Sequence, residues 1–510
     1  MKKYLFSFCL TYVIFGYSSA QNVTILPSGI SPTINGTYPR LSYDALIELP
    51  IPQVGDIAYD TTFLCLRVYN GSKWVCTYQN PSNSTPNMAA IVIEGGTSLE
   101  AAKCIAVDAS GYIYITGSFS GTAKFGATTK TSAGEIDIFV AKYNKAGSLE
   151  WVQTAGGTDY EEVKGITIDA NGNIYITGYF GGTTTFDVNT KTTSGGYDIF
   201  VAKYNNIGDL QWLQTAGGGD IDYGYDIAAD VNGNVYVTGY FTGTAKFGTT
   251  TKTSPGGGDT DIFVVKYSTT GSYQWVQTVG DGADDFGLGI ATDASGYVYV
   301  TGFFNGTATF GNTSKLSAGQ EDIFVVKYND AGSVQWVQTA GGTNIDRGVR
   351  ITVDGNGNVY IIGNFSGTAN FGATSKTSVG SRDIFVAKYN NVGTLQWVNT
   401  AGGTNSISGN GIALDASGNV YLTGNFNGTA TFGVTSKTSA GDYDIFVAKY
   451  SNAGSLQWVN TANGGSGSGI STDASGNIYI TGGFGGTVNF GATSKTSAGS
   501  SDIFVVRLQD

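Results

Sequence analysis

A repeat with a period of about 61 residues is the feature that most constrains the fold of this chain. The tetrapeptide Asp-Ile-Phe-Val opens at seven evenly spaced positions, which are Asp137, Asp198, Asp261, Asp322, Asp383, Asp444 and Asp502. A copy of the segment at 171–178, Asn-Gly-Asn-Ile-Tyr-Ile-Thr-Gly, precedes each of them in closely similar form. β-Branched and aromatic runs between glycine turns predict short strands, so the chain is an array of β-structured repeats.

Each repeat contains four predicted strands. In the second repeat these cover 165–169, 174–177, 199–204 and 210–215. A hairpin turn joins the first two strands at 169–173, and a long polar loop is predicted at 181–197 between the second and third. The third strand is apolar on both faces up to Lys203, so it must be covered on both sides. Radially packed blades meet that requirement, whereas a solenoid would need atypical repeats at both ends.

The two ends of the repeat array complement each other. The last repeat stops after its third strand, while residues 90–93 align with the fourth strand of an ordinary repeat at 151–154. A strand that is missing at one end and present at the other predicts a ring closed by strand exchange. The expected fold is therefore all-β, a seven-bladed β-propeller over 88–510, with 90–93 paired beside 503–506.

The repeat motifs also carry a family resemblance. Gly-Ile-x-x-Asp-x-x-Gly-Asn-Ile-Tyr-Ile-Thr-Gly, Asp-Ile-Phe-Val-Ala-Lys-Tyr and Gly-x-Leu-Gln-Trp together resemble the bacterial SBBP β-propeller repeat over residues 90–510. The strand order is similar to that of NHL propellers. The resemblance implies an exported bacterial protein and implies no particular activity.

The N-terminal residues are predicted to direct export. Lys2 and Lys3 precede an apolar run, and Ser18-Ser19-Ala20 offers a small-residue cleavage site, so residues 1–20 read as a signal peptide. The apolar run is too short for a membrane span. The protein is therefore expected to be secreted or held at the cell surface.

Residues 21–87 lack the repeat and are predicted to form a small β-rich module followed by a linker. Part of this stretch resembles a β-module of bacterial surface and phage tail-fibre proteins. A two-residue turn at Asn70-Gly71 would place Cys65 opposite Cys76, and an oxidising compartment would let them form a disulfide. Cys104 lies in an apolar first strand and is predicted to be a buried free thiol.

Composition narrows the classes of function. The chain has no histidine, which removes the commonest general base and metal ligand. Its net charge of −12 disfavours binding to nucleic acid and to anionic membranes. Neither is expected as a partner, and the oligomeric state is left open.

Carboxylates at one repeated position are the candidate ligand-binding residues. Eight residues before each turn aspartate stand Glu100, Glu161, Asp222, Asp285 and Asp346, and then Ile407 and Gly465. Innermost strands line a propeller axis, so these five groups are predicted to ring one mouth of the channel, where they would attract cations or cationic ligands. The alternative is that each carboxylate only caps its own loop. Lysines of the long loops are expected to pair with such acids.

Other repeated residues have a structural interpretation. The turn aspartates are expected to cap turns; Asp169-x-Asn171-x-Asn173 resembles the start of a calcium loop but lacks the downstream glutamate. The Asp-Ile-Phe-Val aspartates should hold loop amides and pair with nearby lysines. One tryptophan per repeat, as at Trp212, predicts packing between blades, although such a ring could also stack on a sugar. The long-loop lysines are expected to be solvated or paired with acids: Lys130, Lys191, Lys252, Lys315, Lys376, Lys437 and Lys495.

Three classes of function follow. The first is a non-catalytic binding or adhesion module at the bacterial cell surface, with a protein or carbohydrate ligand and avidity from repeated sites. The second is an interaction scaffold without a small-molecule site. The third is a carboxylate-based hydrolase or lyase that acts on a surface polymer at the channel mouth. Near-identical repeats without histidine favour the first two, because catalysis needs an asymmetric set of groups. No cofactor is expected; calcium is left open.

Overall fold

The computed structural model describes residues 40–41, 57–60, 65–69, 74–79, 86, 88–255, 258–491 and 493–509. The chain divides into two compact units, Met1–Ser84 and Thr85–Asp510. All named elements in the described ranges are β-strands. Within those ranges there is accordingly no helix of the length and apolarity that a membrane span requires.

The first unit contains a four-stranded sheet in the order β1-β2-β3-β4. Its strands are β1 (Arg40–Leu41), β2 (Ile57–Asp60), β3 (Cys65–Tyr69) and β4 (Trp74–Gln79). β1 is parallel to β2, and the other pairs are antiparallel.

The predicted register of the β3–β4 hairpin is wrong. Opposite residues are Tyr69 and Trp74, Arg67 and Cys76, and Cys65 and Gln79. The connection is longer than a two-residue turn, and a register shift after Leu66 moves the pairing again, so Cys65 does not face Cys76. The side chains of both cysteines lie outside those that the structure describes, and the disulfide stays a prediction.

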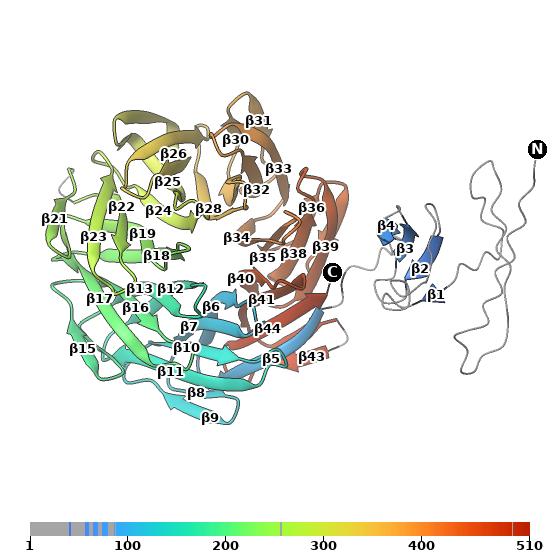
Figure 1. Ribbon diagram of the computed structural model, residues 1–510, viewed down its shortest axis with the longest axis horizontal. Helices are drawn as coiled ribbons and strands as arrows, with labels where there is room; N and C mark the ends of the chain where they lie inside the picture. The colour runs from blue at the N-terminus through green and yellow to red at the C-terminus, as the bar shows by residue number, and fades with distance from the viewer. Residues whose placement is uncertain are drawn as a thin grey trace, which may run out of the picture. The chain divides into compact units, whose positions relative to one another are not determined.

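The second unit is a ring of seven four-stranded antiparallel blades, which confirms the predicted fold (Figure 1). The innermost strands, which number the blades 1 to 7, are β6 (Glu100–Val107), β12 (Glu161–Ile168), β18 (Asp222–Ala229), β24 (Phe286–Thr292), β28 (Asp346–Val353), β34 (Ile407–Leu414) and β40 (Ser466–Thr472). The second strands are β7 (Ile113–Phe119), β13 (Ile174–Phe180), β19 (Val235–Thr242), β25 (Val298–Phe310), β29 (Val359–Phe365), β35 (Val420–Phe426) and β41 (Asn477–Phe484).

The third and fourth strands complete each blade toward the rim. The third strands are β10 (Asp137–Tyr143), β16 (Asp198–Tyr204), β22 (Thr260–Tyr267), β26 (Thr313–Tyr328), β32 (Asp383–Tyr389), β38 (Asp444–Tyr450) and β44 (Asp502–Gln509). The fourth strands are β11 (Leu149–Gly157), β17 (Leu210–Gly218), β23 (Tyr273–Val279), β27 (Val334–Ala340), β33 (Leu395–Gly403), β39 (Leu456–Asn463) and, for blade 7, β5 (Met88–Gly96).

Blade 7 is closed by the strand from the other end of the array. β5 pairs antiparallel with β44, which places Ile93 opposite Phe504 and Val92 opposite Val505. In Figure 1 this blue strand lies beside the red strands of the last blade. The pairing confirms the predicted closure, and both ends of the array are thereby held in one sheet.

The predicted long loop between the second and third strands is wrong, because it forms a β-hairpin. The hairpins are β8–β9 (Thr122–Phe125, Thr128–Thr131), β14–β15 (Thr183–Phe186, Asn189–Thr192), β20–β21 (Thr244–Phe247, Thr250–Thr253), β30–β31 (Thr368–Phe371, Thr374–Thr377), β36–β37 (Thr429–Phe432, Thr435–Thr438) and β42–β43 (Thr487–Phe490, Thr493–Thr496), while in blade 4 the hairpin continues β25 and β26. Alternation in the first strand of each hairpin explains it: the second and fourth residues, mostly Ala and Phe, are buried, and the Thr, Lys or Asn between them are mostly exposed; in blade 2 Thr184 takes the buried place of Ala.

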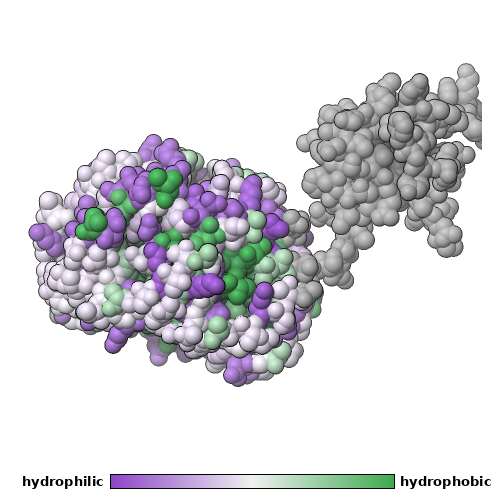
Figure 2. All heavy atoms as spheres, turned by 90° about the horizontal axis from the view of Figure 1, so that it is seen from below, coloured by the Kyte–Doolittle hydropathy of each residue, from purple (hydrophilic) through white to green (hydrophobic). Residues whose placement is uncertain are grey.

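Apolar side chains fill the seams between blades. At the seam of blades 1 and 2, Ile138 and Val140 of β10 pack with Ile174, Ile176 and Phe200 of the next blade. This two-sided burial is why the third strands are apolar on both faces. The side of the ring seen in Figure 2 carries mostly hydrophilic and intermediate residues, with hydrophobic ones in smaller patches.

Candidate functional site

The five predicted carboxylates lie at the mouth of the ring where first strands begin, but they are not accessible there. Glu100, Glu161, Asp222, Asp285 and Asp346 each have 0% of their surface exposed. None of these five side chains exposes any surface to a ligand at this mouth, and their role in ligand binding stays a prediction.

Backbone amides explain the burial of these carboxylates. Asp222 accepts the N–H of Gly218 at 2.7 Å and that of Thr242 at 3.2 Å. Asp346 repeats the arrangement with Gly342 at 2.8 Å and Ser366 at 3.1 Å. Asp222 and Asp346 thus each join the segment that enters their blade to the end of the second strand. This is the loop-capping alternative, and buried amides that lacked such an acceptor would be destabilising.

The Asp-Ile-Phe-Val aspartates hold loop amides, as predicted, and lie beside the first group. Asp198 accepts the N–H of Ser194 at 3.1 Å. A side chain at Gly217 would collide with the carboxyl groups of both Asp198 and Asp222, so those two groups are neighbours. Burial raises the pKa of Asp198 to about 6 and that of Asp222 to about 7, and the charge of Asp198 also raises the pKa of Asp222.

The expected lysine partners of these aspartates are not found. In the described ranges, the ion pairs join Lys103 and Lys164 to Glu162, Lys266 to Asp330 and Arg347 to Glu321. The prediction that long-loop lysines neutralise the buried acids is wrong, because the hairpin carries those lysines away along the rim.

The turn aspartates have the structural role that was predicted. Asp169 accepts the backbone N–H groups of Asn171 and Asn173, the side-chain amide of Asn173 and the hydroxyl of Tyr175, at 2.7 to 2.9 Å. Burial would raise its pKa, but these hydrogen bonds lower it below the ordinary value. No three metal-ligating His, Cys, Asp or Glu side chains gather within the described ranges. The two carboxylate oxygens of Asp169 are engaged by the turn itself.

The repeated tryptophans join neighbouring blades, which confirms the packing interpretation. The indole N–H of Trp212 donates to Thr269 O at 3.1 Å, and that of Trp275 donates to Asp330 O at 3.0 Å. Each acceptor belongs to the next blade. The rings also contact buried tyrosines, as Trp275 does with Tyr236 at 6.1 Å between centroids.

Positions at which the repeats differ gather at the same mouth. One such position follows the buried carboxylate and holds Ala101, Glu162, Tyr223, Phe286, Arg347, Ser408 and Ser466. Opposite it on the second strand stand Ser118, Tyr179, Tyr240, Phe303, Asn364, Asn425 and Gly483. Because the seven repeats are nearly identical elsewhere, equivalent positions can be compared directly. The positions whose residues differ show where one blade departs from the shared blade structure. An alignment of the seven repeats with one another would have identified these residues from the sequence.

Aromatic rings at these two positions, together with Tyr160, form a continuous row, the aromatic file, from blade 2 to blade 4. Its members are Tyr160, Tyr179, Tyr223, Tyr240, Phe286 and Phe303. Successive ring centroids lie 6.2, 3.7, 5.1, 4.4 and 4.7 Å apart. Each step between blades inserts a ring of one blade against a ring of the blade before it, so the file is rigid.

Charged groups flank the aromatic file at both ends. At blade 2, Glu162 accepts the hydroxyl of Tyr179 at 2.6 Å and pairs with Lys103 at 2.9 Å and Lys164 at 3.0 Å. Burial opposes ionisation, yet the two lysines lower the pKa of Glu162 to about 2, so it is a carboxylate at neutral pH. At blade 5, Arg347 lies 4.5 Å over the ring of Phe303.

A cavity of about 380 Å³ lies on the axis, lined by the first strands of all seven blades. Three side chains make it asymmetric: Cys104, Asp226 and Arg350 occupy a position that is Gly165, Gly289, Gly411 and Gly469 in the other blades. A Cβ at Gly165 would lie 3.0 Å from the Cα of Asp226, and one at Gly289 would lie 3.0 Å from that of Arg350. The glycines therefore make room for their neighbours.

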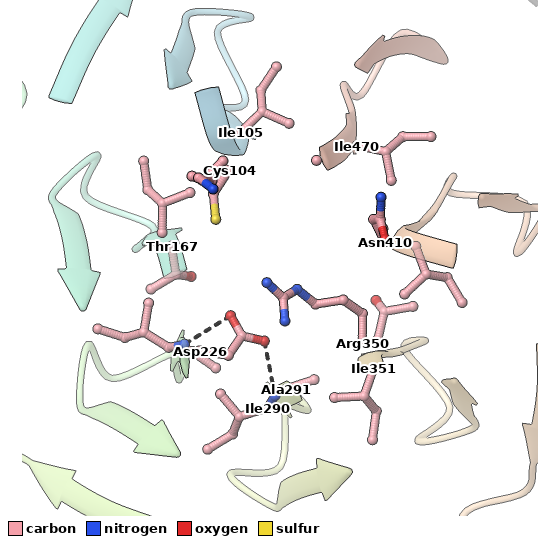
Figure 3. A pocket seen from close by; sticks show the side chains of 18 of the residues that line it. Cys104, Ile105, Thr167, Asp226, Ile290, Ala291, Arg350, Ile351, Asn410 and Ile470 are labelled. Atoms are coloured by element: carbon pink, nitrogen blue, oxygen red, sulfur yellow. Dashed lines mark hydrogen bonds between the residues drawn. The ribbon is translucent and has the colours of Figure 1, made fainter. Parts of the chain in front are cut away.

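Asp226 and Arg350 point toward each other across this cavity (Figure 3). Asp226 accepts the N–H of Ile227 at 3.0 Å and that of Ile290 at 3.1 Å. Burial raises its pKa, and the positive charge of Arg350 acts against that rise. These two residues were not identified from the sequence. An alignment of the innermost strands shows them as charged residues at a position where four other blades have glycine.

Cys104 is a free thiol that faces the cavity and is partly exposed, so the prediction of full burial is wrong. Its Sγ donates to Lys164 O at 3.0 Å. Burial raises the pKa of the thiol to about 11, while nearby cations lower it. The thiol is therefore protonated at neutral pH and is a poor nucleophile.

Comparison with known proteins agrees with the fold. The SBBP family model, a beta-propeller repeat, matches residues 150–179 and 211–243, which confirms the resemblance there. The uncharacterized WD repeat-containing protein L264 of Acanthamoeba polyphaga mimivirus is 25% identical over 441 residues, which cover 68% of this chain and 31% of that protein. The regulatory protein FlaEY of Caulobacter vibrioides is 24% identical over 416 residues, which cover 74% and 42%. The chain spans less than half the length of either relative.

Similar solved structures are propellers of low sequence identity. The WD40 beta propeller domain of Doa1 has a TM-score of 0.42 and 10% identity, and the alignment covers 83% of this chain and 97% of that one. A gluconolactonase from Xanthomonas campestris has a TM-score of 0.31 and 11% identity, with coverage of 82% and 98%. At this distance neither bears on the activity of this chain.

Proposed function

We propose that this chain is an exported, non-catalytic propeller that binds a protein or carbohydrate ligand at the bacterial cell surface through the mouth of blades 1 to 5. The observation that carries the proposal is the aromatic file. Its rings occur where the repeats differ, on a ring whose other positions are nearly copies of one another. Differences between copies are most economically explained by a ligand that contacts those blades.

Exposed apolar residues at the same mouth support a binding surface. Leu99, Ile221 and Ile345 precede the buried carboxylates of blades 1, 3 and 5, and are 41%, 42% and 40% exposed. Together with partly exposed Tyr160, Tyr223 and the guanidinium of Arg347, they have the composition of interface hot spots, which are rich in Tyr and Arg. The net charge of −12 disfavours nucleic acid as the ligand.

A carboxylate-based hydrolase or lyase has less support. Such an enzyme needs two carboxyl groups that reach the substrate with separated pKa values. The five candidate ligand-binding acids are fully buried, and Glu162 is held by two lysines and a tyrosine. The chemistry of the mouth is that of a surface that binds.

The test replaces exposed apolar residues without disturbing the core. The variant Leu99→Ser/Ile221→Ser/Ile345→Ser removes mouth contacts, and Val188→Ser/Val392→Ser/Val434→Ser is the matched control, because those valines are exposed outside the mouth. Both are assayed for binding to a cell-surface glycan array, to purified surface polymers and to surface proteins, with and without calcium. We expect the mouth variant to weaken binding at least about tenfold and the control to leave it unchanged.

Equal binding by both variants would refute the mouth as the binding surface. The location is tested separately by fractionating the producing cells and determining the N-terminus of the mature protein. Loss of residues 1–20 from an extracellular or surface fraction is expected. A full-length N-terminus in the cytoplasm would refute export.

A further inference from the structure

Arg350 presents one unused edge of its guanidinium to the axial cavity. Its Nη1 donates to Leu288 O at 2.8 Å and to Val349 O at 3.2 Å, and its Nη2 makes a long contact of 3.4 Å with Lys164 O. In the described part of the chain no acceptor is bonded to its Nε–H. The Nε–H is thus without an acceptor, and Nη2 keeps one of its two hydrogens for a further contact on the same edge, while Nη1 anchors the group.

Arg347 provides an example in this protein of the Nε and Nη2 edge of an arginine bound to a carboxylate. Its Nε donates to one carboxylate oxygen of Glu321, and its Nη2 donates to the other at 2.8 Å. This two-point geometry matches a planar carboxylate and gives direction as well as strength. The corresponding edge of Arg350 faces the cavity (Figure 3).

Asp226 supplies the opposite charge on the facing wall. Each of its oxygens accepts one backbone N–H, from Ile227 and Ile290, and a carboxylate oxygen can accept a second hydrogen bond. Of the ion pairs between described residues, none joins Asp226 to Arg350, so the two groups do not neutralise each other by contact. A cationic or hydrogen-bond-donating group placed between them would reach Asp226.

The remaining wall at this level mixes isoleucines with small polar side chains, among them Thr167 and Asn410 (Figure 3). Ile105, Ile290, Ile351 and Ile470 line it, and the Cys104 thiol is already bonded to Lys164 O. A volume of about 380 Å³ is in the range of pockets that hold small ligands. A partly polar cavity with two facing opposite charges suits a small zwitterion, whose side chain would lie against the isoleucines.

We propose that the axial cavity binds a free α-amino acid or a ligand of the same chemistry, with its carboxylate on the free edge of Arg350 and its ammonium group toward Asp226. This second site is independent of the ligand surface at the mouth. Its two charged contacts come from blades 3 and 5, two of the three blades whose innermost strands replace glycine with a functional side chain. A large partner at the mouth and a small molecule on the axis could then be bound by one ring.

Three matched probes test this with the unmodified full-length protein. Isothermal titration calorimetry compares leucine with leucinamide, which lacks the carboxylate, and with 4-methylpentanoate, which lacks the amine. Glycine and alanine are titrated as smaller amino acids. We expect an amino acid to bind at least about tenfold more tightly than its amide or its deaminated acid. No binding of any amino acid at millimolar concentration, or equal affinity for leucinamide, would overturn the proposal.

Variants then assign the two contacts. Arg350→Lys keeps the charge but loses the planar edge, and it should weaken amino-acid binding at least about tenfold. Arg382→Lys is its control, because Arg382 contacts Ser406 and Ser408 at the mouth. If Arg350→Lys fails to fold, Asp226→Asn decides: the affinity for the best-binding amino acid should fall toward that of its deaminated acid. Wild-type affinity in a folded variant at either position would contradict the assignment.

Discussion

At five of the seven blade seams, two buried carboxyl groups lie close together, one from the Asp-Ile-Phe-Val motif and one from the start of the next blade. Burial, together with the charge of Asp261, raises the pKa of Asp285 to about 8. The corresponding residue at the other two seams is Ile407 or Gly465, which are neutral. Because an uncharged residue is accommodated at this position in two blades, the buried carboxyl groups of the other five blades are expected to be uncharged, that is, protonated.

Stability should therefore depend on pH in a defined direction. Asp222 and Asp285 have folded pKa values of about 7 and about 8, above the ordinary value of 3.8. The folded chain then holds more protons than the unfolded chain, so this stabilisation is complete below about pH 4 and is lost as the pH rises through about 7 to 8. We expect the free energy of unfolding in urea to be larger at about pH 5 than at about pH 8.

Asp285→Asn tests the assignment of this pH dependence. An amide keeps the oxygen that accepts the N–H of Asn305 and cannot ionise, so the fall in stability between about pH 5 and about pH 8 should shrink by about 1–3 kcal/mol. Asp354→Asn is the control, because hydrogen bonds lower the pKa of Asp354 and its contribution is lost in acid instead. An unchanged pH profile in Asp285→Asn would show that this carboxyl is ionised throughout.

The rim hairpins connect neighbouring blades by strand pairing. β14 pairs with β11 of the preceding blade, which places Phe186 opposite Ala155 and Thr184 opposite Gly157. The hairpin thus extends the sheet of one blade while it belongs to the chain of the next. A seam is held by backbone hydrogen bonds at the rim in addition to apolar packing.

Phe186→Ala should be strongly destabilising. The ring is fully buried and lies 5.0 Å from that of Phe200, so its removal loses apolar burial and leaves a cavity. We expect a loss of about 3–5 kcal/mol in the free energy of unfolding, measured by chemical denaturation. Thr185→Ala, on the exposed face of the same strand, should change it by less than about 0.5 kcal/mol. Equal effects would mean that the hairpin does not pack as described.

The fourth strand holds its neighbour through one tryptophan. Trp275→Phe keeps an aromatic ring but removes the N–H that donates to Asp330 O. Leaving that carbonyl without the donor should lower the free energy of unfolding by about 1–2 kcal/mol. Gln274→Ala, at an exposed adjacent position, is the control and should have little effect. A negligible loss for Trp275→Phe would show that water replaces the indole without penalty.

The whole ring depends on a contact between its two ends. β5 supplies the outer strand of blade 7, so the first and last repeats are joined by backbone hydrogen bonds along a full strand. Closure removes the exposed edges that an open array would present. Closure also brings together all seven first strands, without which the axial cavity and its facing charges would not exist.

Deletion of residues 88–97 should open the ring. The edge of β44 would be exposed, and its apolar residues would promote association between molecules. We expect a lower melting temperature, loss of a single cooperative transition and oligomers in size-exclusion chromatography. Deletion of residues 1–84, which belong to the other compact unit, should leave the transition of the ring unchanged. A cooperative monomer after deletion of 88–97 would contradict closure by this strand.

Local and periodic features were determined by the sequence itself. The repeat period, the glycine turns and the complementary ends predicted seven blades and their closure. Asp169 could be assigned to its turn because its hydrogen-bond partners lie two to six residues away. Such short-range chemistry does not depend on the rest of the fold.

The direction of side chains at the mouth was decided only by the tertiary structure. Every first strand has a register shift near its third residue, as between Val163 and Gly165, and such a bulge changes which face later residues take. Strict alternation therefore misplaces Cys104, which follows the register shift of its strand and faces the cavity. The facing of Asp226 and Arg350 depends on ring closure, because residues 124 positions apart meet only when all the blades surround one axis.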